Sequence, residues 1–331
     1  EISACLVGSE MCIRDRFKLD PAFKDYIWGG TRLRDEYGKK CDYDKVAESW
    51  ELSCHKDGPS VVADGEYKGL TLNEYIEKAG KGVLGKNCER FENFPILIKL
   101  IDAKDNLSVQ VHPDNDYAMR VEGEYGKTEM WYVVDCDEGA TLLYGFKHEI
   151  TKEEFARRIA DNTLLEVTNA VPVKKGDVFF IKSGTLHAIG KGILIAEIQQ
   201  NSNTTYRIYD YGRVGKDGKP RELHVDKALD VTKLAPAEQY PETPVEKKDG
   251  YDIKLLSKCE YFTTYRVNVE TKAELDADEN SFNSILVLEG EPVISGGETV
   301  SAKKGESVFI SAGTGKYTVE GKCTFVLTKI D

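Results

Sequence analysis

Two polar side chains stand two residues apart on a short apolar segment, within the stretch NLSVQVHPDND at 106–116. In a strand, residues i and i+2 point to the same face, so Gln110 and His112 aim at one place. An amide oxygen and an imidazole nitrogen can both bind a divalent metal ion. The pattern raises metal binding as a hypothesis, although a single histidine in a strand is more often a hydrogen-bonded core or surface residue.

Two further candidate ligands follow along the chain. Glu129 opens the strand-like segment TEMWYVV, and His187 stands in SGTLHAIG, just after a glycine turn that returns the chain toward a barrel interior. Two imidazoles, a carboxylate and an amide carbonyl form an acceptable ligand set for a catalytic zinc ion. Each side chain alone has an ordinary structural explanation, and only their joint placement on successive strands favours a metal site.

The segments that must position these side chains alternate apolar runs with glycine-marked turns, as in FPILIKLI, GDVFFIKSG and ILIAEIQQ. This spacing predicts a mostly β fold, a sandwich or barrel with a few added helices. Helices are expected over 71–82 and 151–162, which both begin with a Thr-x-x-Glu capping box, and around 225–231.

A repeat divides the β pattern into two similar units. The segment KKGDVFFIKSGTLHAIG at 174–190 matches KKGESVFISAGTGKYTVEG at 303–321, with two glycines at identical spacing. The second copy has Lys316 where the first has His187, and it contains no histidine. We therefore expect a second unit of the same fold that lacks the metal ligands.

The proline- and charge-rich stretch 233–252 is the best linker candidate. The predicted domains are a catalytic domain at 17–232 with helical additions and a C-terminal β-domain at 253–331. The tail at 1–16, EISACLVGSEMCIRDR, has neither an amphipathic period nor the layout of a signal peptide. We interpret it as translated sequencing adaptor and exclude it from the fold argument.

Bulk composition excludes several classes of function. The chain of 331 residues carries a net charge of −12, whereas proteins that bind nucleic acid or membrane surfaces usually present a broad basic field. No apolar run approaches the ~20 residues needed to span a bilayer. The eight cysteines are scattered without a CxxC pair, which is typical of reduced thiols in the cytoplasm. We expect a cytoplasmic monomer or weak homodimer with no nucleic-acid or membrane partner.

A single charge, Lys99, interrupts the apolar strand FPILIKLIDA. Burying an unpaired ammonium group is costly, so Lys99 needs an anionic partner. That partner is either a carboxylate in a structural salt bridge or the phosphate group of a ligand. In the second case Arg207 and Lys127 would complete a local basic cluster within an acidic protein, and Arg213 is a further candidate.

Four segments together resemble the signature segments of the type I phosphomannose isomerase family: LSVQVHPDNDYA, GKTEMWYVV, SGTLHAIG and TTYRIYDYGR. The resemblance runs from about residue 17 to about residue 233. It departs at Lys182, in a turn that usually carries proline in this fold. The family implies a cupin barrel (a double-stranded β-helix or jelly roll), here followed by a degenerate cupin-like β-domain. It also implies one zinc ion per chain, with the ligands Gln110, His112, Glu129 and His187.

On this resemblance the reaction interconverts mannose 6-phosphate and fructose 6-phosphate through a cis-enediol. Arg207 matches the family's catalytic arginine, and Lys127 and Ser108 match polar substrate contacts. Lys99 and Glu197 fit two further active-site positions. A lysine beside a zinc ion and an arginine loses its proton more readily, which favours Lys127 as the proton-transfer base. Glu197 and a metal-bound hydroxide are alternatives.

Three other functions stay open at this point. Another cupin isomerase or epimerase that modifies sugar phosphates shares the fold, but it is not expected to combine the KTE and YRIYDYGR segments. An iron(II) dioxygenase uses two histidines and a carboxylate with open positions, one of which Gln110 would occupy. A non-catalytic cupin that binds sugar phosphates would keep the pocket without turnover.

Overall fold

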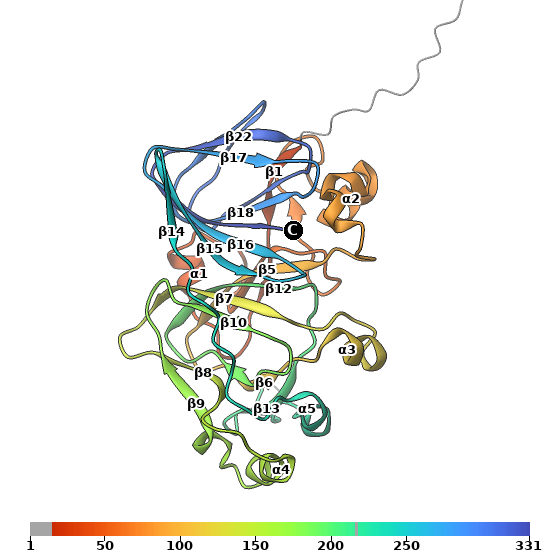
Figure 1. The fold of residues 1–331 in the computed structure, drawn as a ribbon, viewed down its shortest axis with the longest axis vertical. Coiled ribbons are helices and arrows are strands. Elements are labelled where there is room, and N and C mark those ends of the chain that lie inside the picture. Colours follow the sequence, from red (N-terminus) through yellow and green to blue (C-terminus); the bar gives the residue numbers. More distant parts are fainter. Residues whose placement is uncertain (1–14, 216–217) are drawn as a thin grey trace, which may run out of the picture.

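A computed structural model describes residues 15–215 and 218–331, and these residues form four antiparallel sheets. Figure 1 shows the sheets stacked along the long axis, with the C-terminal strands at one end and helices α4 (Lys152–Ala160) and α5 (Val225–Val231) at the other. The mostly β fold predicted from the alternating pattern is confirmed. Residues 1–14 of the predicted tail lie outside the described part of the chain.

Two facing sheets, which we call the first barrel, form the half that carries the candidate site. Their strands are β2 (Ala22–Lys24), β3 (Glu48–Leu52), β5 (Ile96–Ala103), β6 (Val109–Val111), β7 (Glu129–Cys136), β8 (Thr141–Phe146), β9 (Thr168–Pro172), β10 (Val178–Ile181), β11 (His187–Ala188), β12 (Ile193–Gln200) and β13 (Tyr206–Tyr209). One sheet has the order β10-β7-β12-β5-β3-β2 and the other the order β13-β6-β11-β8-β9. Apolar side chains such as Ile101, Trp131 and Leu142 pack between the two sheets.

The second barrel consists of an eight-stranded and a four-stranded sheet. Its strands are β1 (Arg16–Asp20), β4 (Val61–Val62), β14 (Val245–Lys248), β15 (Tyr251–Lys258), β16 (Thr263–Val269), β17 (Lys272–Ala277), β18 (Asn283–Gly290), β19 (Val293–Ser295), β20 (Thr299–Ser301), β21 (Ser307–Ile310), β22 (Gly315–Glu320) and β23 (Cys323–Lys329). The sheet orders are β14-β15-β16-β23-β18-β21-β1-β4 and β17-β22-β19-β20. Two N-terminal strands, β1 and β4, therefore complete the sheet of the C-terminal half. The predicted linker at 233–252 contains β14.

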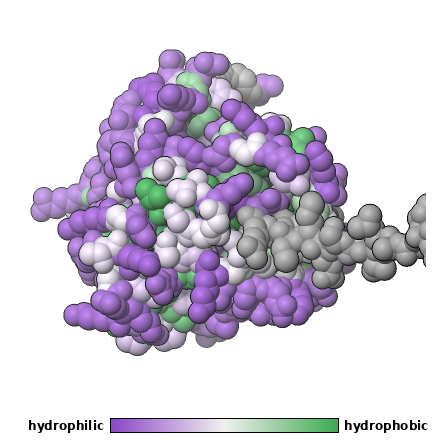
Figure 2. Space-filling view, turned by 90° about the horizontal axis from the view of Figure 1, so that it is seen from above, coloured by the Kyte–Doolittle hydropathy of each residue, from purple (hydrophilic) through white to green (hydrophobic). Residues whose placement is uncertain are grey.

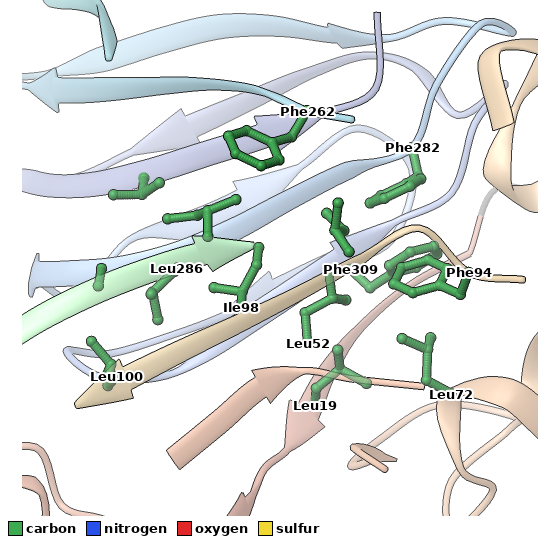
Figure 3. Close-up of a cluster of buried hydrophobic side chains, with 14 of the residues drawn as sticks. Leu19, Leu52, Leu72, Phe94, Ile98, Leu100, Phe262, Phe282, Leu286 and Phe309 are labelled. Carbon is green, nitrogen blue, oxygen red and sulfur yellow. The ribbon is translucent and has the colours of Figure 1, made fainter. Parts of the chain in front are cut away.

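The larger sheets of the two barrels pack against each other through a separate apolar core. Figure 3 shows Ile98 and Leu100 of β5 facing Leu286 and Phe309 across this interface. Each fully buried side chain of this size contributes about 1.5–3 kcal/mol. Side chains of β5 alternate between two environments, so Lys99 and Ile101 point to the opposite face, into the first barrel.

Short helices cover the barrels: α1 (Arg32–Asp35), α2 (Leu72–Ala79), α3 (Asn115–Val121), α4 and α5, with 3-10 turns η1 (Lys81–Leu84), η2 (Lys86–Cys88) and η3 (Leu164–Glu166). The three predicted helices are present as α2, α4 and α5. Thr71 caps α2 by accepting from the backbone N–H of Glu74, whose carboxylate accepts in return from the N–H of Thr71. The segment 111–126 contains α3, whose first turn is capped by the Asp114 carboxylate, which accepts from the N–H of Tyr117.

The surface agrees with the composition. Seen from the end formed by the second barrel, Figure 2 shows a mainly hydrophilic face on which hydrophobic residues form small, separate patches. The six cysteines in the described ranges form no disulfide. Among the described residues, no helix has both the length and the apolar character that a membrane crossing requires.

Candidate active site

The two predicted histidine ligands and the predicted carboxylate ligand come together inside the first barrel. The ligand atoms of His112, Glu129 and His187 all lie within 4.8 Å of one another, and the three side chains are buried. The two imidazole Nε2 atoms are 3.1 Å apart. The carboxylate oxygens of Glu129 lie 3.6 Å from Nε2 of His112 and 3.4 Å from Nε2 of His187.

Strand pairing explains how residues far apart in sequence meet. His187 on β11 lies directly opposite Gln110 on β6, and Gln110 lies opposite Arg207 on β13. Cross-strand partners point to the same face, so Arg207, Gln110 and His187 form one row across the smaller sheet of the first barrel. The turn before β11 is fixed by Gly184, which has a φ of 83° and donates its N–H to the carbonyl of His112. The structure therefore also brings Gln110 to the cluster, where its side-chain amide lies 3.4 Å from Nε2 of His187.

The outer nitrogens of both histidines are held by the backbone. Nδ1 of His112 donates to the carbonyl of Thr204 at 2.9 Å, and Nδ1 of His187 donates to the carbonyl of Thr185 at 2.8 Å. Burial and the charge of Lys127 lower the pKa of His112 well below its ordinary value. Burial likewise lowers the pKa of His187 to about 3. Both imidazoles are therefore neutral at pH 7 and turn their Nε2 lone pairs toward each other.

This arrangement fits a cation. Two facing lone pairs 3.1 Å apart repel each other, and the ammonium group of Lys127 is the positive group beside them in this structure. Oε1 of Glu129 is buried and has no hydrogen-bond partner among the described residues. An unpaired buried carboxylate oxygen is costly, and a metal ion would satisfy it. The donor set of two imidazoles, a carboxylate and an amide suits zinc.

Lys127 places its ammonium group against the same ligand atoms. Nζ donates to Oε2 of Glu129 and lies 3.1 Å from Nε2 of His112. It also lies 3.9 Å from Oε1 of Glu197. Burial and the negative charge of Glu197 raise the pKa of Glu129 to about 8, although Lys127 counteracts this rise. The side chain of Lys127 therefore links the ligand cluster to Glu197.

Glu197 and Lys99 form a fixed, charge-compensated wall of the site. Nζ of Lys99 lies 3.4 Å from Glu197 and 3.5 Å from Glu48. The indole N–H of Trp131 donates to the other oxygen of Glu197 at 2.9 Å. Burial opposes ionisation of Glu197, but the charges of Lys127 and Lys99 hold its pKa below the usual value. Of the two partners expected for Lys99, the structure shows the carboxylates.

A cavity of about 250 Å³ opens beside the cluster. It is lined by polar side chains from both sheets, among them Lys127, Glu197, Ser108 and Arg207. Nε of Arg207 donates to Oγ of Ser108 at 3.3 Å. All the site residues predicted from the sequence except Arg213 therefore lie at the cluster or along this cavity.

Sequence reasoning missed Arg221, which also lines the cavity. It stands in KPRELH, a polar stretch after a glycine turn, without periodicity or a motif to mark it. Trp131 and Glu48 were missed as well. In the sequence, Trp131 has the pattern of a core residue and Glu48 that of a residue at the start of a strand. An acidic side chain opposite the lone charge of β5 was the one available signal, since a buried lysine requires such a partner.

Comparison with known proteins places the chain among isomerases. Residues 16–139 match the family described as phosphomannose isomerase type I, catalytic domain, and residues 252–330 match the mannose-6-phosphate isomerase cupin domain. The chain is 39% identical over 312 residues to mannose-6-phosphate isomerase ManA of Bacillus subtilis, covering 94% of this chain and 97% of that one. It is 40% identical to mannose-6-phosphate isomerase of Streptococcus mutans, over 86% of this chain and 88% of that one.

Solved structures agree with the sequence relatives. The crystal structure of mannose 6-phosphate isomerase from Bacillus subtilis superimposes with a TM-score of 0.90 at 38% identity, covering 95% of this chain and 99% of that one. Apo phosphomannose isomerase from Salmonella typhimurium superimposes with a TM-score of 0.75 at 17% identity, over 96% and 99% of the two chains, a likeness of fold alone.

Proposed function

This chain belongs to the type I phosphomannose isomerase family, and we propose that it interconverts mannose 6-phosphate and fructose 6-phosphate through a cis-enediol with one zinc ion per chain. The observation that carries the proposal is the buried cluster of His112, Glu129 and His187 beside a polar cavity. Two neutral imidazoles and an unpaired carboxylate oxygen at this place favour a divalent cation over a structural role.

Gln110, His112, Glu129 and His187 would hold the zinc ion. When bound, zinc supplies Lewis acidity that stabilises negative charge developing on a sugar oxygen. The backbone carbonyls that accept from the two Nδ1–H groups keep the ligand nitrogens oriented.

We assign the transfer of the proton between C1 and C2 to Lys127. Lys127 lines the cavity, and its Nζ lies between the ligand cluster and Glu197. Its side chain has rotatable bonds, so the amine can move toward the carbon that exchanges the proton. Glu197 is a weaker candidate for this role because Trp131 and Lys99 both hold its carboxylate in place. Arg207, which lies opposite Gln110 on the neighbouring strand, would contact the substrate as a fixed cation.

The test is a coupled assay of purified protein with mannose 6-phosphate and, in parallel, glucose 6-phosphate. We expect turnover of mannose 6-phosphate, loss of activity after chelation and recovery on adding Zn²⁺. Metal analysis should find about one zinc per chain and little iron. Turnover of glucose 6-phosphate alone would favour another cupin isomerase. Binding of mannose 6-phosphate without turnover would favour a non-catalytic sugar-phosphate binder.

A further inference from the structure

Three arginines gather around one carboxylate near the cavity, and we call them the arginine cluster: Arg207, Arg213 and Arg221. The Asp210 carboxylate accepts from Nε and Nη2 of Arg221 at 2.7 and 2.6 Å, a bidentate pair. It also accepts from Nη2 of Arg213 at 2.5 Å. A bidentate pair fixes the plane of a guanidinium group, so Arg221 is oriented before any ligand arrives.

Two members of the arginine cluster face the cavity and the third supports them. Arg207 and Arg221 line the cavity. Arg213 directs Nη1 to the backbone carbonyl of Asn106 at 2.5 Å and does not line the cavity. Nη1 of Arg221 makes no hydrogen bond to another described residue, so it can donate to a ligand in the cavity.

The arginine cluster carries more positive than negative charge. Arg213 and Arg221 share the carboxylate of Asp210. Arg207 donates instead to two neutral groups, Oγ of Ser108 and the backbone carbonyl of Glu222. Burial and the charge of Arg221 lower the pKa of Arg207, as expected for cations held close together. Lys99, by contrast, already has two carboxylate partners, Glu48 and Glu197. The uncompensated positive charge along the cavity therefore lies at the arginine cluster.

We propose that Arg221, held by Asp210, binds the phosphate of the substrate together with Arg207, and that this contact selects phosphorylated sugars. The inference rests on the proposed function. Arg207 and His187 stand two strands apart in one row of the sheet, a separation of about 10 Å. A hexose phosphate has this scale, so its phosphate can lie at the arginine cluster while C1 and C2 lie at the metal ligands. A phosphate monoester carries close to two negative charges at pH 7, so its sign is complementary to that of the arginine cluster.

The deciding measurement is binding of inorganic phosphate to the metal-loaded enzyme by calorimetric titration. We expect Arg221→Gln to weaken phosphate binding about tenfold to a hundredfold, the usual loss for a charge-assisted hydrogen bond to a buried site. Arg221→Lys should recover part of the affinity, because it restores the charge without the fork. Phosphate affinity within twofold of wild type in Arg221→Gln overturns the proposal.

Catalysis supplies the second readout. In Arg221→Gln, kcat/KM for mannose 6-phosphate should fall by a similar factor, mainly through KM, whereas any turnover of unphosphorylated mannose should change less than threefold. Arg213→Gln is the matched control, since it removes a guanidinium from the same carboxylate but not from the cavity. It should leave the phosphate affinity of the enzyme closer to wild type than Arg221→Gln does. Equal loss in both variants contradicts a direct contact.

These outcomes separate this inference from the proposed function. If the wild-type enzyme converts mannose 6-phosphate and Arg221→Gln converts it equally well, the proposed isomerase activity stands and the proposed role of Arg221 is refuted. If the wild-type protein binds phosphate through Arg221 but converts no mannose 6-phosphate, the proposed phosphate site stands and the proposed isomerase activity is refuted.

Discussion

The two barrels share one strand plan and differ in what they place inside it. The six strands of the larger sheet in the first barrel, β10-β7-β12-β5-β3-β2, correspond in order to β21-β18-β23-β16-β15-β14 in the second. The smaller sheets correspond as well, β6-β11-β8-β9 with β17-β22-β19-β20, and the first barrel adds β13 at the edge. A backbone suited to a site is therefore present twice, and the side chains decide which copy has the metal-ligand cluster.

The ligand positions show the difference most clearly. Glu129 pairs with Ile181, and its counterpart Asn283 pairs with Ile310. The side-chain amide of Asn283 donates to the carbonyl of Asp276 and to the hydroxyl of Tyr317, both at 2.9 Å. Where the first barrel leaves a carboxylate oxygen without a partner, the second satisfies its amide donor internally. At this one position, a buried carboxylate oxygen without a partner in the first barrel corresponds to a hydrogen-bonded amide in the second.

The charged wall is also confined to the first barrel. Trp131 has Glu197 opposite it on β12, and Glu197 has Lys99 opposite it on β5. At the corresponding positions of the second barrel stand Leu327 and Tyr265. Ordinary apolar packing replaces the ion pairs there.

The largest effect is expected from His187→Lys, which gives the first barrel the residue found at this position in the second. We expect isomerase activity to fall at least about 10³-fold and bound zinc to fall far below one per chain, because an ammonium group cannot bind the metal. Coupled assays and metal analysis measure both, and circular dichroism checks folding. Retention of zinc together with activity within tenfold of wild type would contradict the ligand assignment.

A second exchange, Glu197→Leu, gives the first barrel the leucine that stands at the corresponding position, Leu327, in the second. It leaves Lys99 with Glu48 as its remaining carboxylate partner, so unfolding free energy should fall by up to about 3–5 kcal/mol. Urea denaturation measures this loss. Adding Lys99→Tyr, as in the second barrel, should restore part of the stability because the buried cation is gone. A double variant no more stable than Glu197→Leu alone would show that the ion pair is not the cause.

The corresponding residues Glu129 and Asn283 also differ in their response to pH, because a carboxyl group can lose a proton and an amide cannot. Without metal, burial and Glu197 raise the pKa of Glu129 to about 8, so below that pH zinc must displace a proton. Zinc affinity should therefore rise about tenfold per pH unit from about pH 5 and level off above about pH 8.

The same shift predicts the stability of the metal-free protein. A raised folded-state pKa contributes stability that is complete below the ordinary value of 4.5 and is lost as pH rises through about 8.

Competition with a coloured chelator at several pH values measures the zinc affinity. A flat profile between pH 5.5 and 8 would contradict the assignment of Glu129 as a buried ligand that must lose a proton.

The smallest effect is expected from Lys316→His, which gives the second barrel the histidine it lacks. Lys316 is exposed and its neighbours in the second barrel offer no imidazole. Activity should stay within twofold of wild type, stability within about 0.5 kcal/mol and zinc near one per chain. A second bound zinc would show that the two barrels differ by less than the structure indicates.

The sequence predicted what local patterns encode. The ligands could be found because each stands in a short strand segment or beside a glycine turn, and the helices because Thr71 and Thr151 begin recognisable caps. The repeat was visible because Gly184 and Gly313 need positive φ in the same turn, at 83° and 79°. These signals depend on residues close together in the chain.

What could not be predicted depends on contacts between distant segments. Arg221 reaches the cavity through its pairing with Asp210, across a turn whose sequence shows no period. The insertion of β1 beside β21 depends on partners at the other end of the chain. The back-to-back packing of the larger sheets has no sequence signature beyond alternation, which reports that a face is buried but not what covers it.

The placement of β1 has a consequence for how the chain folds as it is made. Arg16 donates to the backbone carbonyl of Glu298, a contact that spans 282 positions. At ~5–20 residues per second, a ribosome needs roughly 15–60 s to make the intervening chain. Throughout that interval the first described strand has no neighbour on its β21 side, and an open edge invites association between nascent chains. The first barrel can thus begin to assemble early, whereas β1 can pair with β21 only after the C-terminal strands have been made.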